Sequence, residues 1–353
     1  MQSSESKPKP VLTVPSRKTP AGELALLQTI RARAETSAGG PGQIRSKSRV
    51  RLGIGDDCAL LRPRAGEELA VTTDLSIQGR HFRLDWHPPE SVGHRTLARG
   101  LSDLAAMGAR PVAAFLSLGL PRELTLAQGK SAAWVTRFLD GLLALAAEHG
   151  VPLAGGDLAE SPIAIADIVL TGSVPQGKAL LRSGAQPGDL IYVTGSLGGA
   201  AAELAALEKS PASFAGARAG GKPAPHLFPQ PRVAQGLWLR KRGLASAAMD
   251  LSDGLSTDLA HLCEESGVAA EVDAAALPLG PGATLEMALH GGEDYELLFT
   301  APEKAKIPSR IAGVAIAAVG AISARKSGRG QVVLRTEKGS QQLEPHGWEH
   351  FSK

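Results

Sequence analysis

Apolar runs and amphipathic segments alternate along the whole chain. Short apolar runs predict strands at 69–75, 112–120, 151–157, 163–174, 190–196, 268–273, 295–300, 313–322 and 331–335. Apolar residues at helical spacing predict a helix that begins near Gly22 and further helices at 91–107, 125–149, 198–208, 232–243 and 256–267. Strands that alternate with helices in this way favour an α/β or α+β fold.

Turn-forming residues divide this pattern into two halves of similar size. Residues 175–189 are rich in Gly, Pro and Gln and are expected to form the junction between two domains. We therefore expect an N-terminal domain over 22–175 and a C-terminal domain over 176–353, preceded by a disordered basic tail at 1–21. The Gly/Pro/Ala-rich stretch 209–231 is predicted to be a surface loop.

Charge and composition exclude several classes of protein. Of the 353 residues, 43% are hydrophobic and 21% are charged, as is typical of a globular protein. Residues 1–51 hold ten Lys and Arg against three Glu, so the net charge of +3 reflects the tail and gives no reason to expect a nucleic-acid surface. The longest apolar run, Ile311–Ile322, is too short to cross a bilayer and predicts a core strand. Two cysteines without a CxxC pattern favour a reduced, cytoplasmic setting.

Candidate chemistry lies in six short acidic motifs. They are GIGDDCALL (53–61), TTDL (72–75), LSDLAAMGA (101–109), GGD (155–157), DLSDGLSTD (250–258) and GGEDYELLF (291–299). A single Asp beside Gly is usually a turn or capping residue. Taken together, however, carboxylates and hydroxyls without clustered His or Cys are the ligands of hard cations such as Mg²⁺. We expect TTD, GGD and SDG each to end a strand or open a helix, where ligands gather in α/β folds.

Other motifs leave alternatives open. The chain has no GxxxxGK[ST] loop, no protein-kinase motif set, no GxSxG and no HExxH. Arg182 either reaches a polyphosphate or makes a surface ion pair. Glu293 and Asp294 either cap a helix or bind a ligand, and Trp348 either pins the C-terminal segment or stacks on a flat heterocycle.

These motifs, in this order, closely resemble those of the thiamine-monophosphate kinase family of the aminoimidazole-ribotide synthetase-like superfamily. The resemblance covers about residues 22–353 and includes GRHF (79–82), LLRSGA (180–185), YVTG (192–195) and the closing HGWEHF (346–351). It implies the two-domain fold of that superfamily, with a homodimer formed through the N-terminal domains. It also implies several Mg²⁺ ions and ATP as co-substrate, with thiamine monophosphate as the acceptor.

The resemblance also implies roles for individual residues. The implied metal ligands are Asp57, Thr72, Thr73, Asp74, Asp103, Asp157, Asp250 and Asp253. The implied nucleotide contacts are Gly156, Asp157, Arg182 and Ser252, and the implied thiamine-phosphate contacts are His81, Glu293 and Trp348. No acid or base is expected, because the acceptor phosphate is ionised at neutral pH. The tail and the 209–225 stretch lie outside the resemblance.

Two alternatives are open, of which only the second belongs to a different functional class. The first is another ATP-using enzyme of the superfamily, such as a cyclo-ligase. GGEDYELLF and HGWEHF count against that enzyme, and the absence of a cysteine near the C-terminus counts against the cysteine-dependent members. The second is a non-catalytic nucleotide-binding protein, which the retention of an oxygen ligand at every matched position disfavours.

Overall fold

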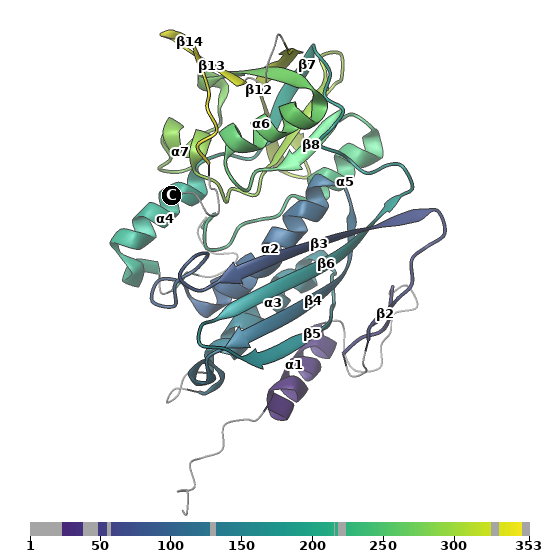
Figure 1. Ribbon diagram of the computed structural model, residues 1–353, viewed down its shortest axis with the longest axis vertical. Helices are drawn as coiled ribbons and strands as arrows, with labels where there is room; N and C mark the ends of the chain where they lie inside the picture. Colours follow the sequence, from purple (N-terminus) through teal and green to yellow (C-terminus); the bar gives the residue numbers. More distant parts are fainter. Residues whose placement is uncertain are drawn as a thin grey trace, which may run out of the picture.

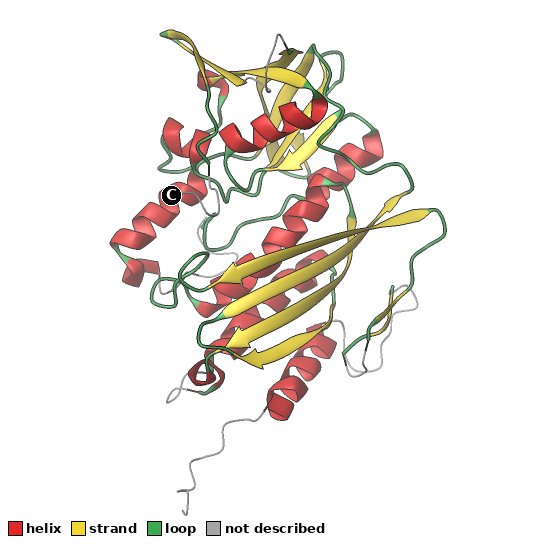
Figure 2. Ribbon diagram, in the orientation of Figure 1, coloured by secondary structure: helices red, strands yellow, loops and turns green. Residues whose placement is uncertain are grey.

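The chain folds around two β-sheets that are joined by a long helix (Figures 1 and 2). The computed structural model describes residues 23–37, 49–54, 58–127, 132–214, 216–217, 224–325 and 332–347. The first sheet has four strands in the order β3-β6-β4-β5, and the second has the order β14-β13-β9-β12-β7-β10-β8, with β11 beside β12. Two short strands, β1 and β2, pair separately.

The elements before the junction build the first sheet and its helices. The strands are β1 (Val50–Leu52), β2 (Leu60–Leu61), β3 (Glu67–Ile77), β4 (Arg110–Leu120), β5 (Leu153–Glu160) and β6 (Ile165–Pro175). The helices are α1 (Glu23–Ser37), α2 (Pro89–Ala106) and α3 (Trp134–His149), with a 3₁₀ turn η1 (Arg122–Thr125) before α3.

The elements after the junction build the second sheet. The strands are β7 (Asp189–Thr194), β8 (Ala247–Asp250), β9 (Val268–Asp273), β10 (Leu297–Pro302), β11 (Arg310–Ile311), β12 (Val314–Ala324), β13 (Val332–Thr336) and β14 (Gly339–Gln342). The helices are α4 (Gly199–Lys209), α5 (Val233–Arg242), α6 (Leu255–Ser266) and α7 (Leu285–His290), with 3₁₀ turns η2 (Pro211–Phe214) and η3 (Ala274–Ala276).

Helix α2 is the element that connects the two halves. It packs on α3 and on β3 and β6 of the first sheet, and it also contacts α5 and β8 of the second half. The approach to α3 is close: a Cβ at Gly141 would lie 1.8 Å from the carbonyl oxygen of Glu90, so only glycine fits there. One face of α2 can therefore carry side chains that meet residues from both halves.

The α/β class is confirmed, and most expected elements are present within a few residues of their predicted bounds. The single helix expected at 125–149 was wrong in its first part. Leu126 is extended (φ −102°, ψ 139°), so η1 is a separate turn that buries Leu124, and α3 begins only at Trp134. The division into domains at 175/176 stays a prediction, and the 1–21 tail lies outside the described residues.

The prediction of a surface loop at 209–231 was also wrong in part. Leu227 and Phe228 are buried, and together with Trp86 they form a small apolar cluster. The carboxylate of Glu203 accepts the backbone N–H of His226 at 2.6 Å, which fixes the chain against α4. The apolar side chains after the Gly-rich portion therefore draw this segment into the molecule.

TTD and GGD lie inside strands, contrary to the expectation that they end them. Thr72 to Asp74 occupy the middle of β3, and Gly156 lies within β5. These strands are 11 and 8 residues long, and they extend beyond the apolar runs from which they were predicted. Only SDG lies where it was expected, between the end of β8 and the start of α6.

Candidate active site

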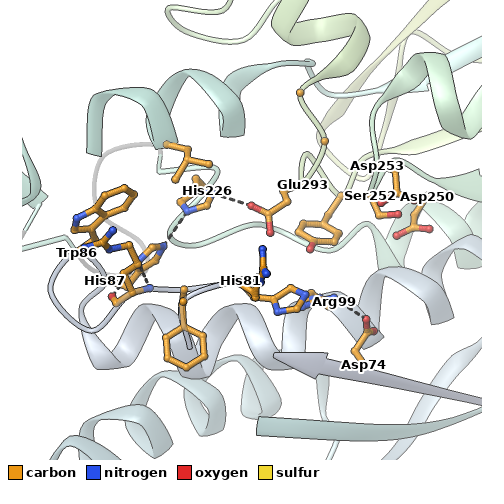
Figure 3. Close-up of a pocket in the computed structure, with 18 of the residues that line it drawn as sticks. Asp74, His81, Trp86, His87, Arg99, His226, Asp250, Ser252, Asp253 and Glu293 are labelled. Atoms are coloured by element: carbon orange, nitrogen blue, oxygen red, sulfur yellow. Dashed lines mark hydrogen bonds and ion pairs between the residues drawn. The ribbon is translucent and has the colours of Figure 1, made fainter. Parts of the chain in front are cut away.

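A pocket of about 480 Å³ lies between the two halves and gathers seven of the predicted site residues (Figure 3). They are Asp74, His81, Asp103, Asp250, Ser252, Asp253 and Glu293. The pocket has two chemically different ends. Carboxylates occupy one end, while His81, Trp86, His87 and His226 lie toward the other.

The acidic end takes one side chain from each of several elements. Strand alternation on β3 turns Asp74 toward α2, which contributes Asp103, while Asp250 ends β8 and Asp253 follows it. The hydroxyl of Thr72 donates a hydrogen bond to Asp103. The acidic end is thus assembled from segments that lie up to 179 residues apart in sequence, from Asp74 to Asp253.

Two of these carboxylates, the half-buried Asp103 and the buried Asp250, lie close to one another. Ser102 Oγ on α2 donates to Asp250 Oδ2 at 2.7 Å, which ties β8 to α2. Burial raises the pKa of Asp103 above its usual range, and the neighbouring charges of Asp250 and Asp74 raise it further. Burial also raises the pKa of Asp250. Such oxygen donors, held near one another out of water, suit a divalent cation that would offset their charge.

Within the part of the chain that the structure describes, no three acidic, His or Cys side chains stand close enough to hold an ion by themselves. This agrees with the coordination chemistry of Mg²⁺, which keeps several waters and is usually held by one or two carboxylates together with substrate phosphates. The donor set therefore fits Mg²⁺ ions that are shared between the protein and a phosphorylated ligand.

The opposite end is organised around Glu293. Arg95 Nη2 on α2 contacts Glu293 Oε1 at 2.6 Å, and His226 Nδ1 lies 3.1 Å from Glu293 Oε2. Burial alone would raise the pKa of Glu293, but Arg95, His226 and Arg99 outweigh it and hold that pKa far below its usual range. Glu293 is therefore ionised at neutral pH, in a pocket whose walls are aromatic.

The histidines beside Glu293 form a chain of hydrogen bonds. His87 Nδ1 lies 3.1 Å from the backbone nitrogen and 3.2 Å from the carbonyl oxygen of Arg83, and His87 Nε2 lies 3.0 Å from His226 Nε2. His226 Nδ1 lies 3.1 Å from Glu293 Oε2 and 2.9 Å from Arg95 Nη1, so the tautomers of the two rings set the direction of the chain. Burial lowers the pKa of both histidines, which agrees with neutral rings. The hydrogen bonds of these histidines hold the Glu293 carboxylate in place at the pocket wall.

The three carboxylates of the motif GGEDYELLF have different partners in the structure. Gly292 and Glu293 have positive φ values of 66° and 58°, a bend that turns Glu293 into the pocket. Asp294 accepts the N–H groups of Gly198 and Ala200 at 2.6 and 3.2 Å and so caps the start of α4. Glu296 pairs with Arg232. Asp294 is therefore a cap and Glu293 lines the pocket, while a ligand-binding role for Glu293 stays a prediction.

Some predicted site residues lie elsewhere. Thr73 is on the outer face of β3 and donates to Asp167 Oδ1 at 3.1 Å. Asp157 is exposed on β5, three strands away from β3, and Gly156 has φ 146° because its backbone closely approaches Leu116. Arg182 is exposed, but its charge lowers the pKa of Asp103 and Asp250. Asp57 and Trp348 lie outside the described residues.

Sequence reasoning missed several residues that line the pocket or, like Arg95, hold a lining residue in place. Arg95 and Arg99 precede Asp103 on α2 by eight and four residues, so helical spacing places all three on one face. That spacing was visible once the helix at 91–107 was predicted. His226 and Trp86 carried no such signal, because only the folded chain brings the end of the 209–231 stretch against the loop that precedes α2.

Comparison with known proteins gives consistent matches over most of the chain. The family model described as AIR synthase related protein, N-terminal domain, matches residues 55–174, and that of the C-terminal domain matches residues 186–333. Thiamine-monophosphate kinase of Salmonella typhimurium is 43% identical, covering 73% of this chain and 78% of the relative. The Bacillus subtilis kinase is 32% identical, covering 86% and 94%.

Solved structures give the same picture. The crystal structure of thiamine-monophosphate kinase from Stenotrophomonas maltophilia is 38% identical with a TM-score of 0.71, covering 89% of this chain and 96% of that one. AaThiL complexed with AMPPCP and TMP is 30% identical with a TM-score of 0.68, covering 97% and 100%. Hydrogenase maturation protein HypE in complex with ATP, at 19% identity and a TM-score of 0.69, shares the fold.

Proposed function

The chain belongs to the thiamine-monophosphate kinase family, and we propose that its two-ended pocket joins the phosphates of ATP and thiamine monophosphate. The enzyme phosphorylates thiamine monophosphate to thiamine diphosphate at the expense of ATP. The observation that carries this proposal is the pairing, within one pocket, of buried carboxylates at one end with an ionised Glu293 among aromatic rings at the other.

The acidic end suits the phosphates and their metal ions. We assign Asp74, Asp103, Asp250 and Asp253 to Mg²⁺, which when bound neutralises phosphate charge and aligns the reacting groups. Family resemblance also implies Asp57, Thr72, Thr73 and Asp157 as ligands. Of these, Thr72 contacts the acidic end through its hydrogen bond to Asp103, whereas Thr73 and Asp157 lie away from it. ATP contacts are assigned on the same ground to Gly156, Asp157, Arg182 and Ser252, of which Ser252 lines the pocket.

The opposite end suits the organic part of the acceptor. Thiamine carries a positively charged ring, and the ionised Glu293 is the complementary charge at that end. His81 lines the same wall, where its Nδ1 accepts the N–H of Ile77 at 3.0 Å, so the neutral ring carries its proton on Nε2. Trp348 is assigned to this end by family resemblance alone.

The reaction needs no general base. The second pKa of a phosphate monoester is about 6, so the acceptor oxygen is ionised at neutral pH. The chain must instead overcome repulsion between two anions, which is about 4 kcal/mol for unit charges 4 Å apart at an effective dielectric constant of 20. We therefore propose direct in-line transfer, without a phosphorylated enzyme. Cyclo-ligase and non-catalytic alternatives find no support in the relatives that match at 32–43% identity.

We further propose that two copies associate through the outer face of the first sheet. Helices α2 and α3 cover the inner face, whereas Leu69, Val71 and Leu75 on β3 are 45, 64 and 46% exposed on the outer face. Exposed apolar side chains in a row on one face of a sheet favour contact with another protein. We take that protein to be a second copy of this chain, because the family resemblance implies a homodimer. The two free cysteines, Cys58 and Cys263, support a cytoplasmic location.

Within the described residues, no helix combines the length and apolar character that crossing a membrane requires.

The proposed function is tested by incubating the purified protein with ATP, MgCl₂ and thiamine monophosphate and separating the products. We expect equal amounts of thiamine diphosphate and ADP, none without Mg²⁺, and none when thiamine replaces its monophosphate. Absence of thiamine diphosphate, together with turnover of ATP on another phosphorylated acceptor, would overturn the assignment.

A further inference from the structure

Arg99 lies on α2 at the boundary between the two ends of the pocket. Arg95, Arg99 and Asp103 follow one another at four-residue intervals on one helix face, so each lies about 6 Å further along the axis. Arg95 contacts Glu293, and Asp103 belongs to the acidic end. Figure 3 shows Arg99 between His81 and Asp74.

The contacts that the Arg99 guanidinium makes with Asp74, Ser76 and Leu75 are long. Its Nη2 lies 3.2 Å from Asp74 Oδ1, while its Nη1 lies 3.2 Å from Ser76 Oγ and 3.3 Å from the carbonyl oxygen of Leu75. Charge-assisted N–H to O bonds are usually 2.7–2.9 Å long, and the planar fork of arginine matches phosphate with two parallel bonds. A phosphate beside Arg99 would therefore offer better partners than those it has.

Arg99 also differs from the other arginines among the described lining residues. Arg80 is exposed, and Arg83 is paired with Asp85 and lies over the ring of Trp86. The side chain of Arg99 is only 16% exposed. Its charge is therefore little weakened by solvent and lies among carboxylates that would otherwise repel an incoming anion.

The acceptor phosphate has to occupy this boundary. Its thiamine part belongs beside Glu293, and its reacting oxygen has to meet the nucleotide at the acidic end. We propose that Arg99 binds the phosphate of thiamine monophosphate and holds it in line with the γ-phosphate of ATP, a role that rests on the proposed function. Arg99 then selects the phosphorylated vitamin over free thiamine.

The experiment compares two ligands that differ only in the phosphate. Binding of thiamine monophosphate and of thiamine is measured by titration calorimetry in Mg²⁺ buffer without nucleotide, for the wild type, Arg99→Ala, Arg99→Lys and Arg99→Gln. For Arg99→Ala we expect a 10- to 100-fold loss of affinity for the monophosphate, as for other charged hydrogen bonds. Affinity for thiamine should change less than twofold, and Arg99→Lys should retain part of the preference.

Arg137→Ala is the matched control, since Arg137 on α3 makes a two-bond ion pair with Glu90 at the start of α2, and neither residue lines the pocket. It should leave both affinities unchanged. If Arg99→Ala does not fold, Arg99→Gln, which keeps most of the side-chain volume, answers the same question.

Three results would overturn the inference. They are equal losses for both ligands, an unchanged preference for the monophosphate, and a loss confined to the ATP analogue AMPPCP in a parallel titration. Wild-type protein that binds neither thiamine compound and makes no thiamine diphosphate would overturn the proposed function and this inference with it. If only the inference about Arg99 is wrong, the wild-type protein still makes thiamine diphosphate. The two negative results can therefore be told apart.

Discussion

Arg95 Nη2 on α2 lies 2.6 Å from Glu293 Oε1, across the interface between the two halves of the molecule. The same guanidinium donates to the carbonyl oxygen of His226 at 2.5 Å and to that of His81 at 3.3 Å. One side chain of the first half thus fixes the loop after α7, the segment before α5 and the loop after β3. The geometry of the substrate end depends on this single buried cation.

Replacement of Arg95 by Ala should therefore damage both stability and substrate binding. The Arg95 side chain is 5% exposed and that of Glu293 is 28% exposed, so Glu293 would keep a partly buried charge with less compensation. We expect a loss of about 2–3 kcal/mol in the free energy of unfolding. Urea denaturation measures the loss, and the KM for thiamine monophosphate should rise more than that for ATP. In Arg95→Ala/Glu293→Ala the loss should be smaller than the sum of the single losses; additive losses would contradict the ion pair.

Asp103→Asn should separate catalysis from stability. Asp103 is a half-buried carboxylate beside Asp250 and Asp74, and the amide removes one of three like charges. We expect turnover to fall at least about 100-fold while the metal-free protein becomes more stable, by about 1 kcal/mol. Initial rates and thermal unfolding in EDTA check the two effects. Normal turnover would remove Asp103 from the metal-binding residues.

His87 should make the fold sensitive to acid. Burial, followed by the charges of Arg95 and His226, lowers the pKa of His87 to about 3, whereas Glu293 acts in the opposite direction. The unfolded chain takes up a proton near pH 6.5 but the folded chain does not. The stability associated with neutral His87 is therefore complete above pH 6.5 and declines toward pH 3, by at most about 1.4 kcal/mol per pH unit.

His87→Gln should flatten this slope, measured by urea denaturation at several pH values between 7 and 4. The control is His261→Gln, the same change at an exposed position of α6. An identical slope in the wild type and His87→Gln would show that His87 does not contribute to acid sensitivity.

Val71→Glu tests the proposed association of two copies. Val71 is 64% exposed on the outer face of β3, and a charge buried between two such faces would be unpaired. We expect the dimer to dissociate, with the mass measured by light scattering after size-exclusion chromatography falling by half. Leu279→Glu, at another exposed apolar position, should leave the mass unchanged. A wild type that is already monomeric refutes this association.

The sequence by itself determined the α/β class and most of its elements, because apolar periodicity is a local property of the chain. Motif order likewise identified the family and seven residues that the fold brings to one pocket, since carboxylates in Gly- and Ser-rich contexts carry a chemical signal. Asp103 and Glu293 were found in this way.

Only the tertiary structure decided how the pocket is supported and divided. The roles of Arg95, Arg99 and His226 depend on contacts with residues up to 198 positions away in the sequence. The packing of α2 against both sheets creates those contacts. The end of the 209–231 stretch is buried because Leu227 and Phe228 meet Trp86 in the folded chain, a contact that local composition does not encode. Local patterns specify elements and ligand chemistry, whereas partners distant in sequence are set by packing.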